Sequence, residues 1–255
     1  MMMWRCMGIP MSEAVRANLH GKIVLVTGAA KRIGREIALR LSAEGARVAI
    51  HYYGSETEAR QTAKDCGGAE LFRANLESVP EIEGMFREID ARLGGLDCLV
   101  NNAARFTKID PLAVTEQDWD FIHNVNLKAT FFCAKEAAIR MKARGGGRIV
   151  NISSLGGLRP WADHSHYCAS KAGVIMLTKS LAKAWAPEIT VNSVAPGVIP
   201  FGEQNEPEVS QMIHATPAGR PGSGAELADA VVYFLESPTF ITGQVLAVDG
   251  GLSLR

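Results

Sequence analysis

From Lys22 onward, short apolar stretches alternate with longer amphipathic ones. The short stretches are rich in Val, Ile and Leu and predict buried strands at residues 22–27, 46–53, 69–74, 96–102, 148–154, 189–196 and 244–250. The longer stretches carry apolar residues at helical spacing, and they predict helices at 33–45, 55–68, 79–95, 116–147, 164–187 and 225–236.

The order of these elements predicts the fold class. Apolar strands that alternate with helices are typical of a parallel sheet with helices on both faces. Because crossovers between parallel strands are right-handed, we expect a doubly wound, Rossmann-type α/β sheet of seven strands. The 255-residue chain shows no repeat or linker, so residues 20–255 are expected to form a single domain. Residues 1–19 lack this pattern, and we expect a flexible leader there.

Composition narrows the range of partners and compartments. Lys and Arg together number 27, as do Asp and Glu, so no net charge favours nucleic acid or an anionic membrane surface. No apolar run approaches the roughly 18 residues that a membrane span needs. The five cysteines are scattered and form no C-x-x-C pair, which is typical of a reduced cytoplasmic protein.

The first predicted strand leads into the turn TGAAKRIGRE (27–36). Gly28 leaves the strand, and Gly34 lets the following helix pack closely against it. The free N–H groups at the start of that helix can hold a pyrophosphate. The middle glycine of the dinucleotide-binding pattern is absent, so an ordinary turn between strand and helix stays open as an alternative.

The end of the second predicted strand favours one cofactor. NAD-binding sites usually carry a carboxylate here for the ribose hydroxyls, but the stretch HYYGS (51–55) has none. Lys31, Arg32, His51 and Ser55 can all donate to a 2′-phosphate, so we expect NADPH rather than NADH. The alternative is that these polar side chains only face water.

The segment HSHYCASK (164–171) contains several reactive side chains. On a helix, residues four apart share a face, which pairs Tyr167 with Lys171 and His164 with Cys168. A metal site needs three or four ligands and the second pair has no evident partners, so we predict no metal. Nothing near Cys168 suggests an oxyanion hole, which argues against a cysteine nucleophile.

Tyr167 and Lys171 together suggest acid catalysis. An ammonium beside a phenol stabilises the phenolate and lowers the tyrosine pKa. Such a tyrosine can donate a proton to a carbonyl or imine as hydride arrives from a nicotinamide.

With these residues, the chain resembles the short-chain dehydrogenase/reductase family over residues 20–252. The motifs are TGAAKRIG (27–34), NNAA (101–104), NVN (124–126), ISS (152–154), YCASK (167–171), NSVAPG (192–197) and VDGG (248–251). The resemblance implies a catalytic tetrad of Asn126, Ser154, Tyr167 and Lys171. Ser154 lies at the family's usual interval of thirteen residues before Tyr167, so Ser153 is the neighbour and not the catalyst.

The resemblance also implies a role for each member of the tetrad. Ser154 holds the substrate carbonyl and Tyr167 donates the proton. Lys171 binds the nicotinamide ribose and lowers the Tyr167 pKa, while Asn126 positions a water in the proton relay.

The cofactor contacts follow from the same resemblance and from the two stretches described above. Asn75 and Leu76 should border the adenine, and the backbone of Ile199 should meet the carboxamide. The full set expected to bind NADPH is Gly28, Lys31, Arg32, Ile33, Gly34, His51, Tyr53, Ser55, Asn75, Leu76, Asn102, Ala103, Ala104, Tyr167, Lys171, Pro196, Gly197 and Ile199.

Two details resemble the pteridine reductases and dihydromonapterin reductases within this family. Arg32 stands where most members have glycine, and Phe106 falls where a phenylalanine stacks on the pterin. These features predict a dihydropterin substrate bound by Arg32, Phe106, Ser154 and Tyr167. Ser154 stands where the eukaryotic pteridine reductases carry aspartate and suits plain carbonyl reduction. The alternative within enzymes is therefore a 3-oxoacyl-carrier-protein reductase or a general ketone reductase. The alternative outside enzymes is a non-catalytic sensor that binds NADPH.

The two long predicted helices suggest association. They carry more apolar residues than one core-facing stripe requires, among them Phe131, Phe132, Cys133, Ile175, Met176 and Leu177. The family resemblance implies a homotetramer built partly on these helices.

Overall fold

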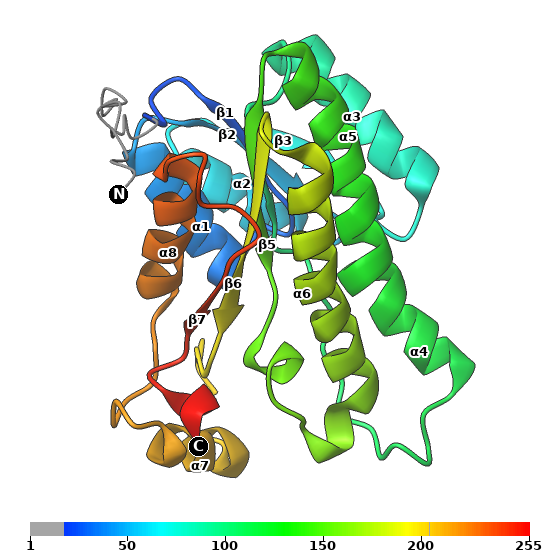
Figure 1. Cartoon of the computed structure of the whole chain (residues 1–255), viewed down its shortest axis with the longest axis vertical. Helices are drawn as coiled ribbons and strands as arrows, with labels where there is room; N and C mark the ends of the chain where they lie inside the picture. The colour runs from blue at the N-terminus through cyan, green and yellow to red at the C-terminus, as the bar shows by residue number, and fades with distance from the viewer. Residues whose placement is uncertain (1–17, 204) are drawn as a thin grey trace, which may run out of the picture.

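A seven-stranded parallel sheet lies at the centre of the molecule (Figure 1). The computed structural model describes residues 18–203 and 205–255. The strands are β1 (Ile23–Val26), β2 (Arg47–Tyr52), β3 (Glu70–Arg73), β4 (Cys98–Asn101), β5 (Gly147–Ile152), β6 (Ile189–Pro196) and β7 (Val245–Val248). They pair in the order β3-β2-β1-β4-β5-β6-β7, which confirms the predicted doubly wound α/β fold.

Helices cover both faces of the sheet, as Figure 1 shows. On one face lie α1 (Arg32–Ala43), α2 (Glu56–Asp65) and α8 (Gly224–Glu236). On the other face lie α3 (Val79–Leu93), α5 (Ala129–Ala143) and α6 (Ser165–Trp185). Two separate clusters of buried apolar side chains result, one on each side of the sheet. This explains why the strands are apolar on both faces.

The strand order changes direction at β1, which has β2 on one side and β4 on the other. Chains leaving the carboxyl ends of β1 and β4 therefore diverge to opposite faces of the sheet. Ligands bind at such a switch point in doubly wound sheets because the diverging loops leave a crevice.

One predicted helix differs from the structure in a way that affects the site. The region 116–147 consists of α4 (Glu116–His123), a π-helical turn (Asn124–Lys128) and α5, and the helix ends at Ala143. Gly145 and Gly146 follow with φ angles of 87° and 132°, in the region that favours glycine. The π-turn has no signature in the apolar pattern, because its one extra residue shifts the helical spacing only locally.

A further helix and the start of the domain also differ from the prediction. Helix α7 (Pro207–Ala215) was not predicted, and it contains no fully buried residue that would give a clear apolar stripe. Three short 3₁₀ turns complete the structure at Leu155–Gly157, Ala162–His164 and Leu252–Leu254. Most of the predicted leader lies outside the described residues, but Leu19 is buried in the core. No helix among the described residues is both long and apolar enough to span a membrane.

Candidate active site

The turn after β1 brings the chain closely past the start of α1. Gly28 has a φ of 63°, and a Cβ on Gly34 would lie 2.3 Å from the Gly28 carbonyl oxygen. Only glycine permits this approach, as the sequence predicted. Lys31 precedes α1 and makes no side-chain cap, so the side chain leaves the first N–H groups of the helix free for an anion.

Residues at the end of β4 hold this turn from one side. The Asn102 side-chain amide donates to the carbonyl oxygens of Thr27 and Gly28 at 2.9 and 3.1 Å. In return, the Thr27 hydroxyl accepts from the backbone N–H groups of Asn102 and Ala103 at 2.9 and 3.0 Å. Asn102 thus positions the first turn as well as lining the cavity beside it.

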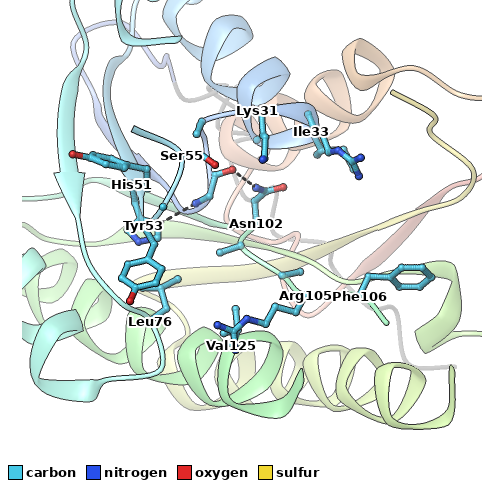
Figure 2. A pocket seen from close by; sticks show the side chains of 18 of the residues that line it. Lys31, Ile33, His51, Tyr53, Ser55, Leu76, Asn102, Arg105, Phe106 and Val125 are labelled. Carbon is cyan, nitrogen blue, oxygen red and sulfur yellow. Dashed lines mark hydrogen bonds between the residues drawn. The ribbon is translucent and has the colours of Figure 1, made fainter. Parts of the chain in front are cut away.

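A cavity of about 470 Å³ opens beyond the ends of β1, β2 and β4, and Figure 2 shows its lining. It is lined by the predicted cofactor residues Gly28, Lys31, Arg32, Ile33, Gly34, His51, Tyr53, Ser55, Asn75, Leu76, Asn102, Ala103, Ala104 and Ile199. Three cationic side chains lie in this lining, Lys31, Arg32 and Arg105, and the described lining contains no Asp or Glu, although Arg32 and Arg105 pair with carboxylates outside it. The donor set therefore suits an anionic dinucleotide that carries an extra phosphate.

His51 does not occupy the position that the sequence predicted. Its side chain is 2% exposed and points inward from the end of β2. The Gly28 N–H donates to its Nδ1 atom and its Nε2 atom donates to the Ala74 carbonyl, each over 3.0 Å (Figure 2 draws the first of these bonds). Both ring nitrogens are used, so the ring cannot donate to a 2′-phosphate. Lys31, Tyr53 and Ser55 remain at the cavity as donors for one.

A second, adjoining cavity of about 290 Å³ contains the predicted catalytic residues of α6 and β5. It is lined by Ser154, Tyr167, Lys171, Pro196, Gly197 and Ile199, together with residues shared with the first cavity. Both cavities lie at the carboxyl edge of the sheet. A dinucleotide lying across the first can therefore present its reactive end to the second.

Burial, more than the neighbouring lysine, sets the acidity of Tyr167. Burial raises the pKa of the Tyr167 phenol to about 12, and a hydrogen bond with Ser154 acts against that rise. Burial also lowers the pKa of Lys171 to about 8. The predicted lowering of the Tyr167 pKa by Lys171 is therefore wrong for this structure, because desolvation of the phenol dominates.

The two serines at the end of β5 face different ways. The Ser153 hydroxyl donates to the Val194 carbonyl and accepts from the Ser193 hydroxyl, so it is bound within the sheet. The Ser154 hydroxyl accepts the Gly156 N–H at 3.0 Å and interacts with Tyr167. Both serines line the second cavity, and it is Ser154 that interacts with Tyr167, so Ser154 stays the serine predicted to be catalytic.

Asn126 lies in the π-helical turn, and its side chain hydrogen bonds to Arg105 and to Ser170. Its side-chain amide donates to the Arg105 carbonyl at 2.9 Å and to the Ser170 hydroxyl at 3.1 Å, and its oxygen accepts the Arg105 N–H at 2.7 Å. These bonds join the loop after β4 to α6, close to Tyr167. Both amide hydrogens are used, so Asn126 has only its oxygens left to position the relay water that the sequence analysis assigned to it.

Comparison with known proteins agrees with this geometry. Residues 28–253 match a family model described as enoyl-(acyl carrier protein) reductase. The chain is 38% identical over 240 residues to the 3-oxoacyl-(acyl-carrier-protein) reductase FabG of Staphylococcus aureus, a match that covers 91% of this chain and 98% of the relative. This chain belongs to the short-chain dehydrogenase/reductase family.

Other members of the family share the same length and architecture. Nodulation protein G of Rhizobium meliloti is 39% identical over 244 residues, covering 93% of this chain and 99% of that protein. A gluconate 5-dehydrogenase from Burkholderia cenocepacia, solved in complex with NADP and tartrate, superposes with a TM-score of 0.87 at 32% identity. That match covers 96% of this chain and all of the neighbour. As a short-chain dehydrogenase/reductase, the chain is an oxidoreductase.

Phe106 lies at the mouth of the two cavities and is 58% exposed. Its ring stacks on His164 with centroids 4.8 Å apart and meets the Tyr167 ring edge to face at 4.8 Å. Trp161 lies parallel to the Tyr167 ring at 6.1 Å. The second cavity of this short-chain dehydrogenase/reductase is therefore lined by aromatic rings.

Arg32 reaches across the cavity instead of pointing only toward the cofactor phosphates. Its guanidinium pairs with the Glu203 carboxylate, which also accepts the Phe201 N–H at 2.6 Å. Arg32 is the only residue other than glycine with a positive φ in the described part of the chain, at 53°. Such strain at a cavity is a mark of a functional position.

Three contributing residues were missed by the sequence analysis. Glu203 pairs with Arg32, and Trp161 lines the second cavity. Arg105 lines the cofactor cavity, and its guanidinium pairs with Glu77. Trp161 could have been suspected from its place between Ser154 and Tyr167. The other two had no local signal, because their partners are remote in sequence.

Proposed function

We propose that this chain is an NADPH-dependent reductase of a carbonyl group. The observation that carries the proposal is the position of Ser154, Tyr167 and Lys171 in one cavity that adjoins a cationic cofactor cavity. Two cation-bearing residues at the first turn, Lys31 and Arg32, and the lack of a carboxylate in the described lining support NADPH over NADH.

The chain's own residues supply the acid part of the reaction. When bound, the nicotinamide supplies a hydride to the carbonyl carbon. Tyr167 then donates its phenolic proton to the carbonyl oxygen, which becomes the hydroxyl of the product alcohol. With a pKa raised to about 12, the phenol carries that proton at every physiological pH.

Ser154 and Lys171 assist Tyr167. The Ser154 hydroxyl accepts from Gly156 and hydrogen bonds with Tyr167, and its hydrogen can turn to the substrate oxygen when a substrate binds beside the phenol. Lys171 donates to the Ile152 carbonyl at 2.9 Å, which leaves two of its three N–H bonds for the nicotinamide ribose and the phenol oxygen. Both groups stabilise negative charge where it develops during the transfer.

A 3-oxoacyl thioester is the first candidate substrate. The FabG relative of Staphylococcus aureus is named for this reaction, and it spans nearly the whole of this chain. Ser154 fits a ketone oxygen, because a single hydroxyl is enough to hold it.

A reduced pterin is the second candidate, and the aromatic wall favours it. The exposed Phe106 ring and the Trp161 ring beside Tyr167 offer flat surfaces for a heteroaromatic ring. Offset stacking on such rings contributes about 0.5–1.5 kcal/mol beyond the burial of area.

A substrate screen tests the proposed function. Purified protein is supplied with NADPH and, separately, with acetoacetyl thioesters, small ketones and 7,8-dihydropterins, and the loss of NADPH absorbance is followed. We expect turnover with a ketone-bearing substrate. No oxidation of NADPH with any of these classes would refute the proposed carbonyl reduction, whereas turnover of dihydropterins alone would select the second candidate.

A further inference from the structure

His51 is a buried histidine that the proposed reaction does not use. The Gly28 amide can only donate a hydrogen bond, so the Nδ1 atom that faces it is unprotonated. The Nε2 atom faces the Ala74 carbonyl and therefore carries the proton. The two contacts select one neutral tautomer and use both ring nitrogens.

The two partners of the ring lie on either side of β2, next to residues that line the cofactor cavity. Gly28 begins the turn after β1, while Ala74 directly precedes Asn75 and Leu76 at the end of β3. Neither contact belongs to the sheet ladder, because β1 ends at Val26 and β3 ends at Arg73. The imidazole of β2 thus spans the gap between its two neighbouring strands just past their ends.

Backbone hydrogen bonds reinforce both contacts of the His51 ring. The Ala29 N–H donates to the His51 carbonyl at 3.0 Å, so backbone and ring both hold the first turn to β2. On the other side the Ala74 N–H donates to the Tyr52 carbonyl at 3.2 Å. His51 is therefore the side chain through which the turn and the Ala74–Leu76 segment are joined.

We propose that His51 is a positioning residue for the adenosine half of the dinucleotide, because its ring sets the spacing between the Gly28 turn and the Ala74–Leu76 segment. The inference rests on the proposed use of a dinucleotide cofactor, but it concerns affinity and not the chemical step. His51 is too deeply buried to serve as a phosphate donor, and it acts through the backbone groups that it holds.

The neutral ring is suited to this role. Burial lowers the pKa of His51 to about 4, so the Nδ1 lone pair stays available to Gly28 at neutral pH. A leucine of similar volume would leave the Gly28 N–H and the Ala74 carbonyl without their partner. Asparagine places its Oδ1 atom where Nδ1 lies and keeps the bond to Gly28, while glutamine places its Nε2 atom near the ring Nε2 and keeps only the bond to Ala74.

The experiment measures the binding of 2′,5′-ADP, which represents the adenosine half, to His51→Leu, His51→Asn and His51→Gln. We expect His51→Leu to weaken binding about tenfold, the scale of one to two lost hydrogen bonds. His51→Asn and His51→Gln each keep one of the two contacts, and both should bind 2′,5′-ADP with an affinity between those of His51→Leu and the wild type. Turnover at saturating NADPH should stay within about twofold in all three.

Thr178→Val serves as a matched control for lost stability. Thr178 is fully buried, hydrogen bonds to Asn151 and Val174, and lines neither cavity. The Thr178→Val variant should have a lower melting temperature than the wild type and the same affinity for 2′,5′-ADP. If His51→Leu does not fold, the affinities of His51→Asn and His51→Gln for 2′,5′-ADP, compared with that of the wild type, test the inference.

Two results would overturn the inference. One is wild-type affinity for 2′,5′-ADP in His51→Leu, and the other is wild-type affinity in both His51→Asn and His51→Gln, each of which lacks one of the two contacts. A wild-type protein that prefers NADH would instead refute the proposed cofactor choice. The same variants are then measured with ADP, which lacks the 2′-phosphate, and the same order is expected.

Discussion

The Lys171 ammonium lies 6.0 Å from the centre of the Tyr167 ring and donates to the Ile152 carbonyl at 2.9 Å. The two residues share one face of α6, one helical turn apart. Because burial raises the Tyr167 pKa to about 12, the phenol is a proton donor and not a base at neutral pH. The pair is thus in the protonation state that the proposed carbonyl reduction requires.

Replacing Tyr167 by phenylalanine tests that role. Tyr167→Phe removes the phenolic proton while leaving the ring in place against Phe106 and Trp161. We expect kcat for carbonyl reduction to fall by roughly 10² or more, the scale of a lost general acid. NADPH affinity, measured by fluorescence, should change little. Near-normal turnover in this variant would mean that another group is the acid.

Cofactor choice is tested at Tyr53, because His51 is buried and a charge there would disturb the fold. Tyr53 is 48% exposed and lines the cofactor cavity near Lys31 and Ser55. We expect the wild type to bind NADPH more tightly than NADH, and Tyr53→Asp to narrow that difference by placing a negative charge near the 2′-phosphate. Tyr53→Phe is the control for loss of the ring hydroxyl. Equal affinities in the wild type, at matched ionic strength, would contradict the assignment.

The buried His51 predicts a pH dependence of stability. Its pKa is about 4 in the folded protein against 6.5 unfolded, so acid favours the unfolded chain, which binds the proton more readily. The contribution of the neutral His51 ring to the free energy of unfolding is complete above pH 6.5 and is lost as the pH falls toward 4. Between pH 7 and pH 5 it amounts to roughly 2 kcal/mol.

Urea unfolding at several pH values measures that contribution. Between pH 7 and pH 5, the free energy of unfolding should fall by roughly 2 kcal/mol more in the wild type than in His51→Asn. Effects of other titrating groups cancel in the difference between the two proteins. Parallel curves for both proteins would show that His51 titrates alike in the folded and unfolded states.

Phe106→Ala distinguishes the two candidate substrates. If a reduced pterin stacks on this ring, its KM should rise several-fold in the variant, while KM for a small ketone should barely change. Phe240 is fully exposed and lines neither cavity, so Phe240→Ala is the matched control. An unchanged KM for dihydropterin would remove the stacking argument and with it the second candidate.

Association is predicted by the apolar surface of α5 and α6. Of the apolar residues singled out on these helices, Cys133 and Ile175 are buried in the subunit, but Phe131 and Met176 are 38% and 61% exposed. We expect light scattering to show an oligomer at micromolar concentration, and Phe131→Glu with Met176→Glu to shift it toward monomer. Leu112→Glu, at an almost fully exposed position, should leave the assembly intact. A stable wild-type monomer would reject the prediction.

The sequence by itself determined the fold and placed the candidate catalytic residues on it. Strands buried on both faces give apolar runs in the sequence, as in β1 (Ile23–Val26). Strand β6 also carries polar residues, and it has the bounds predicted for it, Ile189–Pro196. Tyr167 and Lys171 lie one turn apart on α6 as predicted, because helical spacing is local. The Ser153 hydroxyl is bound within the sheet, and the Ser154 hydroxyl interacts with Tyr167.

Only the tertiary structure decided how several of these groups behave. The direction of the His51 ring depends on two strands that flank β2, and neither is near it in sequence. The pKa of Tyr167 is governed by burial, which is a property of the packed protein and not of the pair at i and i+4. Glu203 meets Arg32 only because the loop after β6 folds over the first turn. Contacts of this kind join residues far apart in the chain, so no local pattern records them.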